Sequence, residues 1–285
     1  MSRNQQSAVR LRWQSQVPLS LSMAFAIATV ALRCIARFPA SPTTIIQAFA
    51  MGGMLAILTW KLRAATAAAA LTGGVFTTAL YLATPGWRTA LWPLLALLLL
   101  TLAATRFGRA RKERLGVAES RRGRAASQVT ANLGVAVLAS LPLSLARSST
   151  SPNILGSHAM RMALAAALAE AAADTLSSEL GEVLGGEPYL LTNFRRVPAG
   201  TDGAISLAGS LAGLTGAIVV TGVASFALGF TPAQAAIVAF AALVGLFVDS
   251  FLGAVLERRG WLNNDAVNFL STLTSALLAA ALGCR

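Results

Sequence analysis

The sequence has few of the residues from which many active sites are built. Among its 285 residues are one histidine, His158, and two cysteines, Cys34 and Cys284, at opposite ends of the chain. A zinc centre or a Ser-His-Asp triad needs imidazole or thiolate groups with close partners. A disulfide framework or a C-x-x-C site needs cysteines at short spacings. The sequence therefore argues against all of these sites.

Charge is also scarce, and it is unevenly distributed. Only 12% of the residues are charged, against about a quarter in soluble domains, while 55% are hydrophobic and the mean hydropathy is +0.65. The 23 Lys and Arg residues outnumber 11 acids, for a net charge of +12. Because the basic residues stand in short stretches between apolar runs, we interpret them as topology signals and expect no nucleic-acid partner.

Apolar segments long enough to cross a bilayer dominate the chain. A spanning helix needs about 20 mostly apolar residues. The sequence predicts nine such segments, at residues 18–36, 42–60, 64–83, 88–105, 126–146, 157–176, 204–228, 233–256 and 265–283. We therefore expect an all-α, polytopic membrane bundle in which residues 1–285 form one transmembrane domain. The first segment follows basic residues but has no cleavage site close behind it, so we interpret it as a retained anchor.

The basic residues also predict an orientation. With the N-terminus in the cytoplasm, 17 of the 23 Lys and Arg residues fall in inside segments and six outside. This agrees with the positive-inside rule. We expect a multi-pass protein of a bacterial-type inner membrane or its equivalent, with a cytoplasmic N-terminus.

The acids are the more informative charges. None occurs in the first 112 residues, and nine of the eleven lie between residues 170 and 265. In the predicted topology they join amides at the cytoplasmic ends of the later helices. Several pairs are four residues apart and so share a helix face. The candidate site residues in these helices are Gln128, Asn132, Asp174, Glu179, Asp249, Asn264, Asp265 and Asn268.

Asp174 and Asp249 are the strongest candidates, because an ionisable group inside a span marks a functional site by default. Carboxylates and amides are hard oxygen ligands, and they suit Mg²⁺ held partly by substrate phosphates. We expect Asp174, Glu179 and Asp249 to be catalytic and to bind the metal, together with Asp265. Alternatives remain for the amides, since Gln128 fits a hydrogen bond to a neighbouring helix and Asn264 fits a helix cap.

The loop from Gly185 to Ser206 contains candidate phosphate ligands. Arg195 and Arg196 offer guanidinium groups, and Gly200, Thr201, Asp202 and Gly203 offer backbone N–H groups before an apolar helix. A helix N-terminus favours anions. An equally good reading is a tight turn with a cap, in which the two arginines are topology markers. We interpret the glycines at 209, 213 and 216 as a close-packed helix face. We interpret the basic segment 106–124 as a topology determinant attracted to anionic lipid, with a minority reading as a substrate contact.

Four ordered motifs resemble those of the transmembrane-protein-nineteen family, whose relatives include phytyl-phosphate kinase. They are the segments 173–181, 188–206, 248–254 and 263–268, and residues 123–134 also resemble a family element. The resemblance covers roughly residues 60–283 and leaves out the N-terminal helices of residues 1–60. Family members tend to have Asp where this chain has Asn263, so the resemblance implies that a metal ligand there is either lost or moved to Asp265.

This resemblance implies an integral membrane kinase. Such an enzyme transfers phosphate from CTP or another nucleoside triphosphate to an isoprenyl monophosphate, with Mg²⁺ as cofactor. The implied partners are the bilayer, the isoprenyl phosphate and the nucleotide, and a homo-oligomer is left open. Two alternatives stand beside this function: a lipid or ion transporter or flippase, and a CTP-dependent cytidylyltransferase that acts on a lipid phosphate.

Overall fold

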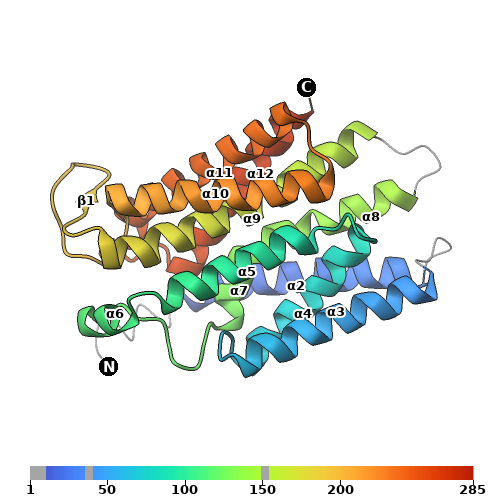
Figure 1. The fold of residues 1–285 in the computed structure, drawn as a ribbon, viewed down its shortest axis with the longest axis horizontal. Coiled ribbons are helices and arrows are strands. Elements are labelled where there is room, and N and C mark those ends of the chain that lie inside the picture. Colours follow the sequence, from blue (N-terminus) through green and yellow to red (C-terminus); the bar gives the residue numbers. More distant parts are fainter. Residues whose placement is uncertain (1–10, 36–40, 149–153, 285) are drawn as a thin grey trace.

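The computed structural model describes residues 11–35, 41–148 and 154–284, which are helical apart from loops and one two-residue strand pair. Figure 1 shows the helices as a bundle of long, roughly aligned rods. The elements are α2 (Arg12–Ile35), α3 (Pro42–Lys61), α4 (Ala67–Ala83), α5 (Leu91–Arg106), α6 (Arg109–Leu115), α7 (Ala126–Leu138), α8 (Ser140–Ser148), α9 (Ile154–Leu184), β1 (Tyr189–Leu190), β2 (Ala204–Ile205), α10 (Leu207–Leu228), α11 (Pro232–Leu252), the π-helix η1 (Gly253–Glu257) and α12 (Asn264–Gly283).

Side-chain caps fix where many of these helices begin. In five helices the residue before the first turn accepts a hydrogen bond from the backbone N–H three residues later, which satisfies one of the unpaired donors at a helix start. The capping residues are Ser41, Thr66, Ser206, Thr231 and Asn263. Proline in the first turn supports two of these starts, at Pro42 and Pro232, since its missing N–H costs nothing there.

The helices confirm the predicted class, a polytopic all-α membrane bundle. Within the described residues, six helices are long and apolar enough to cross a membrane, or seven if α5 and α6 form one span bent by 64°. Length and composition do not identify all nine predicted spans. Helix α4 has only 17 residues, and the 31-residue α9 carries several charges.

Helix α9 lies at the centre of the bundle and packs against α5, α7, α10, α11 and α12. Its middle is rich in alanine, and the residues from Met162 to Ala173 are all buried. Small side chains let neighbouring helices approach from every side. The helix that carries four of the eleven acids is therefore enclosed by protein along its middle.

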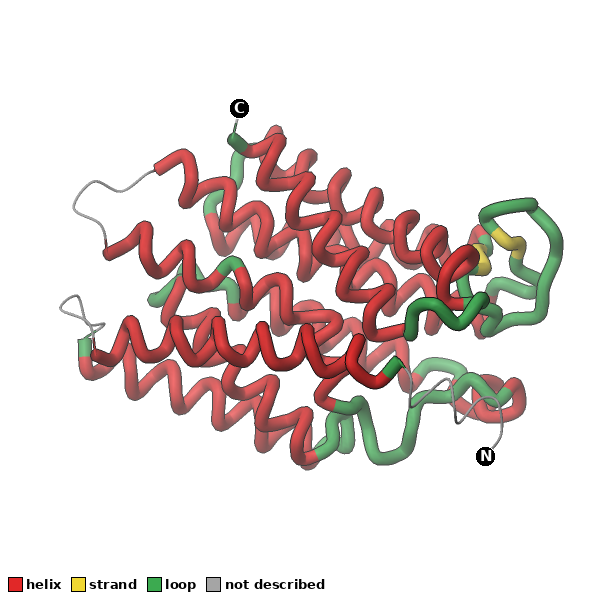
Figure 2. The backbone as a smooth tube through the Cα atoms, turned by 180° about the vertical axis from the view of Figure 1, so that it is seen from behind, coloured by secondary structure: helices red, strands yellow, loops and turns green. Residues whose placement is uncertain are grey.

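Connections that the topology predicts on one side of the membrane do gather at one end of the bundle. Figure 2 shows the strand pair and the long loops at that end. Arg124 pairs through its backbone with the turn after α3, and Asn263 contacts the start of α2. At the opposite end, one cavity is lined by residues of the 84–90 turn, α8, α9 and α10. That the loop-rich end faces the cytoplasm remains a prediction.

Three predicted segments differ from the structure in where a helix begins or in whether the helix is continuous. Helix α2 begins at Arg12 rather than 18, because Gln14 donates a hydrogen bond to the Trp261 carbonyl at 2.9 Å and so gains a tertiary partner. The predicted segment 126–146 agrees in its bounds with one candidate span, Ala126–Ala146, although a turn at Ala139 divides it into α7 and α8. The third residue of α8 is Pro142, which has no N–H to donate to the preceding turn. Helix α10 begins at Leu207 rather than 204.

Candidate functional site

A polar cavity of about 310 Å³ opens among the loops at this end of the bundle. Its walls come from α7, α9, α11 and α12, and residues 199–204 cover it. Most of the predicted site residues line it, although they come from segments far apart in sequence. Those residues are Gln128, Asn132, Asp174, Glu179, Gly200, Thr201, Asp202, Gly203, Asp249, Asn264 and Asn268.

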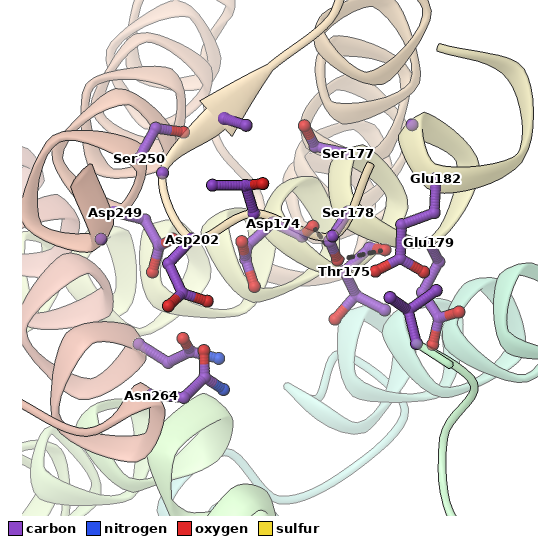
Figure 3. Close-up of a pocket in the computed structure, with 18 of the residues that line it drawn as sticks. Asp174, Thr175, Ser177, Ser178, Glu179, Glu182, Asp202, Asp249, Ser250 and Asn264 are labelled. Carbon is purple, nitrogen blue, oxygen red and sulfur yellow. Dashed lines mark hydrogen bonds between the residues drawn. The ribbon is translucent and has the colours of Figure 1, made fainter. Parts of the chain in front are cut away.

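Asp174 of α9 and Asp249 of α11 both line this cavity, and in Figure 3 Asp202 is seen between them. The Ser271 hydroxyl donates a hydrogen bond to Oδ2 of Asp249 at 3.3 Å. Glycines of α10 pack behind this part of α9. A Cβ atom on Gly213 would lie 3.0 Å from the Ala173 carbonyl oxygen, which supports the interpretation of a close-packed face. Tight packing of α10 against α9 therefore holds the part of α9 that carries Asp174 in position.

The loop that covers the cavity rests directly on α11 and η1. Gly203 has a φ of +70°, and a Cβ atom there would collide with the backbone of Ser250 and Ala254. Only glycine fits such a contact in this conformation. The contact lies at the junction of α11 with the π-helix, a type of irregularity that is frequent at functional sites. Asp202 adds a third carboxyl to the cavity; burial raises its pKa, and Arg258 partly offsets that effect.

The amides have divided roles. Nδ2 of Asn268 donates to Oδ1 of Asn132 at 3.4 Å, so these two side chains connect α12 with α7 across the cavity. Oε1 of Gln128 accepts a hydrogen bond from the Ala125 N–H at 2.7 Å, which commits this oxygen to capping α7. Asn263 is the N-cap of α12, while Asn264 lines the cavity.

The structure corrects the expected role of Glu179. Its Oε2 accepts a hydrogen bond from the buried Lys112 ammonium, and its Oε1 accepts one from the Thr105 hydroxyl at 2.8 Å. A carboxylate paired in this way is already neutralised and is a poor partner for a metal. Glu179 borders the cavity but serves the packing of α6 against α9.

The loop arginines do not reach the cavity. Both Arg195 and Arg196 are exposed, and Arg196 pairs with Glu187 at 3.3 Å and stacks on the Tyr189 ring. Asp265 also lies outside the cavity lining, in the first turn of α12. Thr201 lines the cavity, yet its hydroxyl donates to the Pro198 carbonyl at 2.7 Å. The turn of residues 200–203 is separated from α10 by β2, so it is not a helix N-terminus.

Sequence reasoning missed the basic residue that does line the cavity, Arg124. It lies near enough to attract the Asp174 carboxylate and faces Glu119 at 3.9 Å. Arg124 stands in the same 123–134 segment as Gln128 and Asn132, and this position in the sequence could have indicated it as a site residue. Glu170 shares a helix face with Asp174 but was not among the predicted site residues, and the structure buries it, with 1% of its surface exposed.

The donor atoms set a limit on how a metal would be held. Within the described part of the chain, no group of three or more His, Cys, Asp or Glu side chains is placed to hold a metal ion. The predicted set of Asp174, Glu179, Asp249 and Asp265 is not gathered as one group in these residues, and its role in metal binding stays a prediction. Asp174 and Asp249 are the two members of the set that line the cavity without an ion pair, and the amides of Asn132, Asn264 and Asn268 line the same cavity.

Comparison with known proteins gives a family match over most of the chain. The model described as "Integral membrane protein DUF92" matches residues 49–276. No solved structure matches.

Similar proteins come from plants, cyanobacteria and archaea. The chain is 33% identical over 180 residues to "Protein VTE6, chloroplastic" of Arabidopsis thaliana, which covers 62% of this chain and 53% of the relative. It is 31% identical over 201 residues to an uncharacterized membrane protein of Synechocystis sp., covering 68% and 73% of the two chains. An uncharacterized membrane protein of Methanocaldococcus jannaschii is 38% identical over 118 residues, covering 41% and 49%. The matched regions span about half the length of the plant and archaeal relatives.

Proposed function

The chain belongs to the DUF92 family of integral membrane proteins, and we propose that it is a membrane-embedded kinase for an isoprenyl monophosphate. It uses CTP or another nucleoside triphosphate, with Mg²⁺, and forms the isoprenyl diphosphate at the cytoplasmic face. The likeness to the plant protein and the motif resemblance to phytyl-phosphate kinases support this substrate class.

One observation carries the proposal. Asp174 and Asp249 share a polar cavity at the end of an apolar bundle, with three amides and Arg124 around them. Two acids on one cavity inside a membrane protein repel one another, and a bound cation would offset that repulsion. Phosphoryl transfer depends on such positioning and charge neutralisation, because the reaction needs little covalent help from the protein.

The donor set fits Mg²⁺. This ion is commonly held by one or two carboxylates, with water and substrate phosphates as the remaining ligands. Asp174 and Asp249 would supply the carboxylates, and Asn132, Asn264 and Asn268 would orient water or phosphate oxygens. When bound, Mg²⁺ would supply positive charge that neutralises the phosphates.

The residues of this chain then account for the rest of the reaction. An oxygen of the isoprenyl phosphate attacks the terminal phosphorus of the nucleotide, the bond from that phosphorus to the bridging oxygen breaks, and a nucleoside diphosphate leaves. Arg124 attracts the phosphates beside Asp174, and residues 199–204 form part of the cavity wall.

Purified protein, Mg²⁺ and nucleotide labelled on the terminal phosphate, incubated with a panel of isoprenyl monophosphates, test the proposal. We expect labelled isoprenyl diphosphate and unlabelled nucleoside diphosphate. Release of pyrophosphate would instead indicate a cytidylyltransferase. Flux of lipid or ions in proteoliposomes, with no transfer to any lipid, would indicate a transporter.

Asparagine variants test the two carboxylates. Asp174→Asn and Asp249→Asn should each lower transfer by about 100-fold or more, the scale seen when one key electrostatic group is removed. The matched control is Glu187→Gln, which neutralises an exposed acid outside the cavity. Equal size-exclusion profiles would show that all three variants fold. Full activity in both aspartate variants would refute the assignment.

A further inference from the structure

A second cavity, larger and more apolar, adjoins the polar one. Its volume is about 650 Å³, roughly twice that of the polar cavity, and it lies among α3, α4, α5 and α7. The two cavities share Glu119, Arg124 and Asn132. Leucines from three of the helices form much of its wall, namely Leu55, Leu94, Leu97, Leu98, Leu102 and Leu133.

The end of this groove beside the polar cavity is strongly basic. Five arginines line it, at positions 63, 106, 109, 121 and 124, against two acids, Glu113 and Glu119. Glu113 already pairs with Arg109 at 3.2 Å and Arg121 at 3.0 Å. A net positive charge of three therefore remains at the end of an otherwise apolar groove. Such a surface is complementary to a ligand with an anionic head and an apolar body.

The backbone holds Arg124 at the boundary of the two cavities. Its N–H donates to the Ala64 carbonyl and its carbonyl accepts from the Thr66 N–H, each at 3.0 Å. Gly123 has a φ of +82°, and a Cβ atom there would collide with the same turn. The guanidinium is thus anchored where it borders both the leucine-lined groove and Asp174.

We infer that the groove among α3, α4, α5 and α7 holds the hydrocarbon chain of the substrate, with the phosphate of that lipid at Arg124. This inference rests on the proposed function and adds to it the location of the lipid chain. The shared boundary places the head of such a lipid beside Asp174 while its chain runs between helices. Arg124, which lines both cavities, is then a phosphate-binding residue.

Gly73 lies partway along this groove and offers a means of shortening it. Gly73 lies six residues after the start of α4. Thr77, which also lines the groove, lies ten residues after that start, or about 15 Å along the helix. A Cβ atom on Gly73 meets only Val129, at 4.0 Å, so a larger side chain has room to enter the groove. Leucine also forms helices better than glycine. We therefore expect Gly73→Leu to narrow the groove while leaving the helix intact.

Direct binding to the purified full chain tests the inference. The probes are dimethylallyl, geranyl and geranylgeranyl monophosphate, with inorganic phosphate as a chainless probe, and calorimetry gives each Kd. The wild type should prefer the longest chain. Gly73→Leu should weaken binding of the longest chain by about tenfold, the loss expected from about two methylene contacts, and leave the shortest unchanged. The matched control is Gly53→Leu, on α3 outside the groove and with open space around it.

A second variant, Thr101→Phe, fills the groove from α5 and keeps the test decisive if Gly73→Leu does not fold. Arg124→Gln should weaken all three lipids by a similar factor. Unchanged chain-length preference in both groove variants would overturn the inference. Because binding is measured without turnover, a wild type that binds long chains but transfers no phosphate would refute the proposed kinase and leave the groove assignment standing.

Discussion

The ion pair between Lys112 and Glu179 gives a sharp test of how the site is held together. The Lys112 side chain is 1% exposed and that of Glu179 is 12% exposed. Lys112 also donates to the Ala104 carbonyl at 2.8 Å, so its ammonium links α5, α6 and α9. Removing one partner of a buried pair costs about 3 to 5 kcal/mol, since the other charge stays buried without compensation.

We expect Lys112→Met to lower the free energy of unfolding by about 3 kcal/mol, the lower end of that range. Glu179 keeps its hydrogen bond from Thr105 and has some access to water, which limits the loss. The double variant Lys112→Met/Glu179→Gln carries no unpaired charge there. It should recover to within about 1 kcal/mol of the wild type, as replaced buried pairs often do.

Denaturation of the purified protein in mixed micelles, followed by circular dichroism, measures each variant and closes a double-mutant cycle. The activity of the double variant separates two roles for Glu179. Near-normal phosphate transfer would mean that Glu179 is structural, as its contacts indicate. A stable but inactive double variant would restore the catalytic role predicted from sequence. Single variants that lose less than about 1 kcal/mol, with no coupling, would refute the argument from a buried pair.

Two further substitutions test the elements around the site, each by thermal unfolding in detergent. Asn263→Ala removes the cap of α12 and two hydrogen bonds from the Asn263 amide to the start of α2, so it should cost about 2 kcal/mol. Ser41→Ala, which removes an exposed cap alone, should cost about 1 kcal/mol; equal losses would contradict the tie to α2. Gly203→Ala forces a left-handed backbone and a collision with α11, and it should cost at least about 2 kcal/mol; a loss below about 0.5 kcal/mol would contradict the close contact.

Local composition is enough to predict the class of fold and the general place of the site. A run of apolar residues marks a helix wherever it lies, and alternating basic loops assign its ends. That is why Asn132, Asp174, Asp249 and Asn268 were expected at one level and do line one cavity. The predicted close packing of α10 on α9 also agrees with the structure, because glycines at helical spacing carry that information themselves.

Local composition could not predict side-chain contacts between residues far apart in the sequence. Lys112 and Glu179 are 67 residues apart, and nothing near either residue indicates the other. Arg195 and Arg196 look suited to phosphate, yet their loop turns them toward Glu187 and solvent. Arg124 has the same chemistry and faces the cavity, because backbone pairing with the α3–α4 turn directs it there. Position in space, rather than residue type, decides among such candidates.

The enclosed position of α9 has a consequence for how the protein enters its membrane. Arg161, Glu170 and Asp174 are ionisable residues within α9 and disfavour its insertion, and α9 is not among the helices apolar enough to cross alone. Helices α10, α11 and α12 are apolar enough, and all three follow it in the chain. We therefore expect α9 to integrate stably only together with segments that are made after it. The acids of α9 would in that way tie its insertion to the assembly of the second half of the chain.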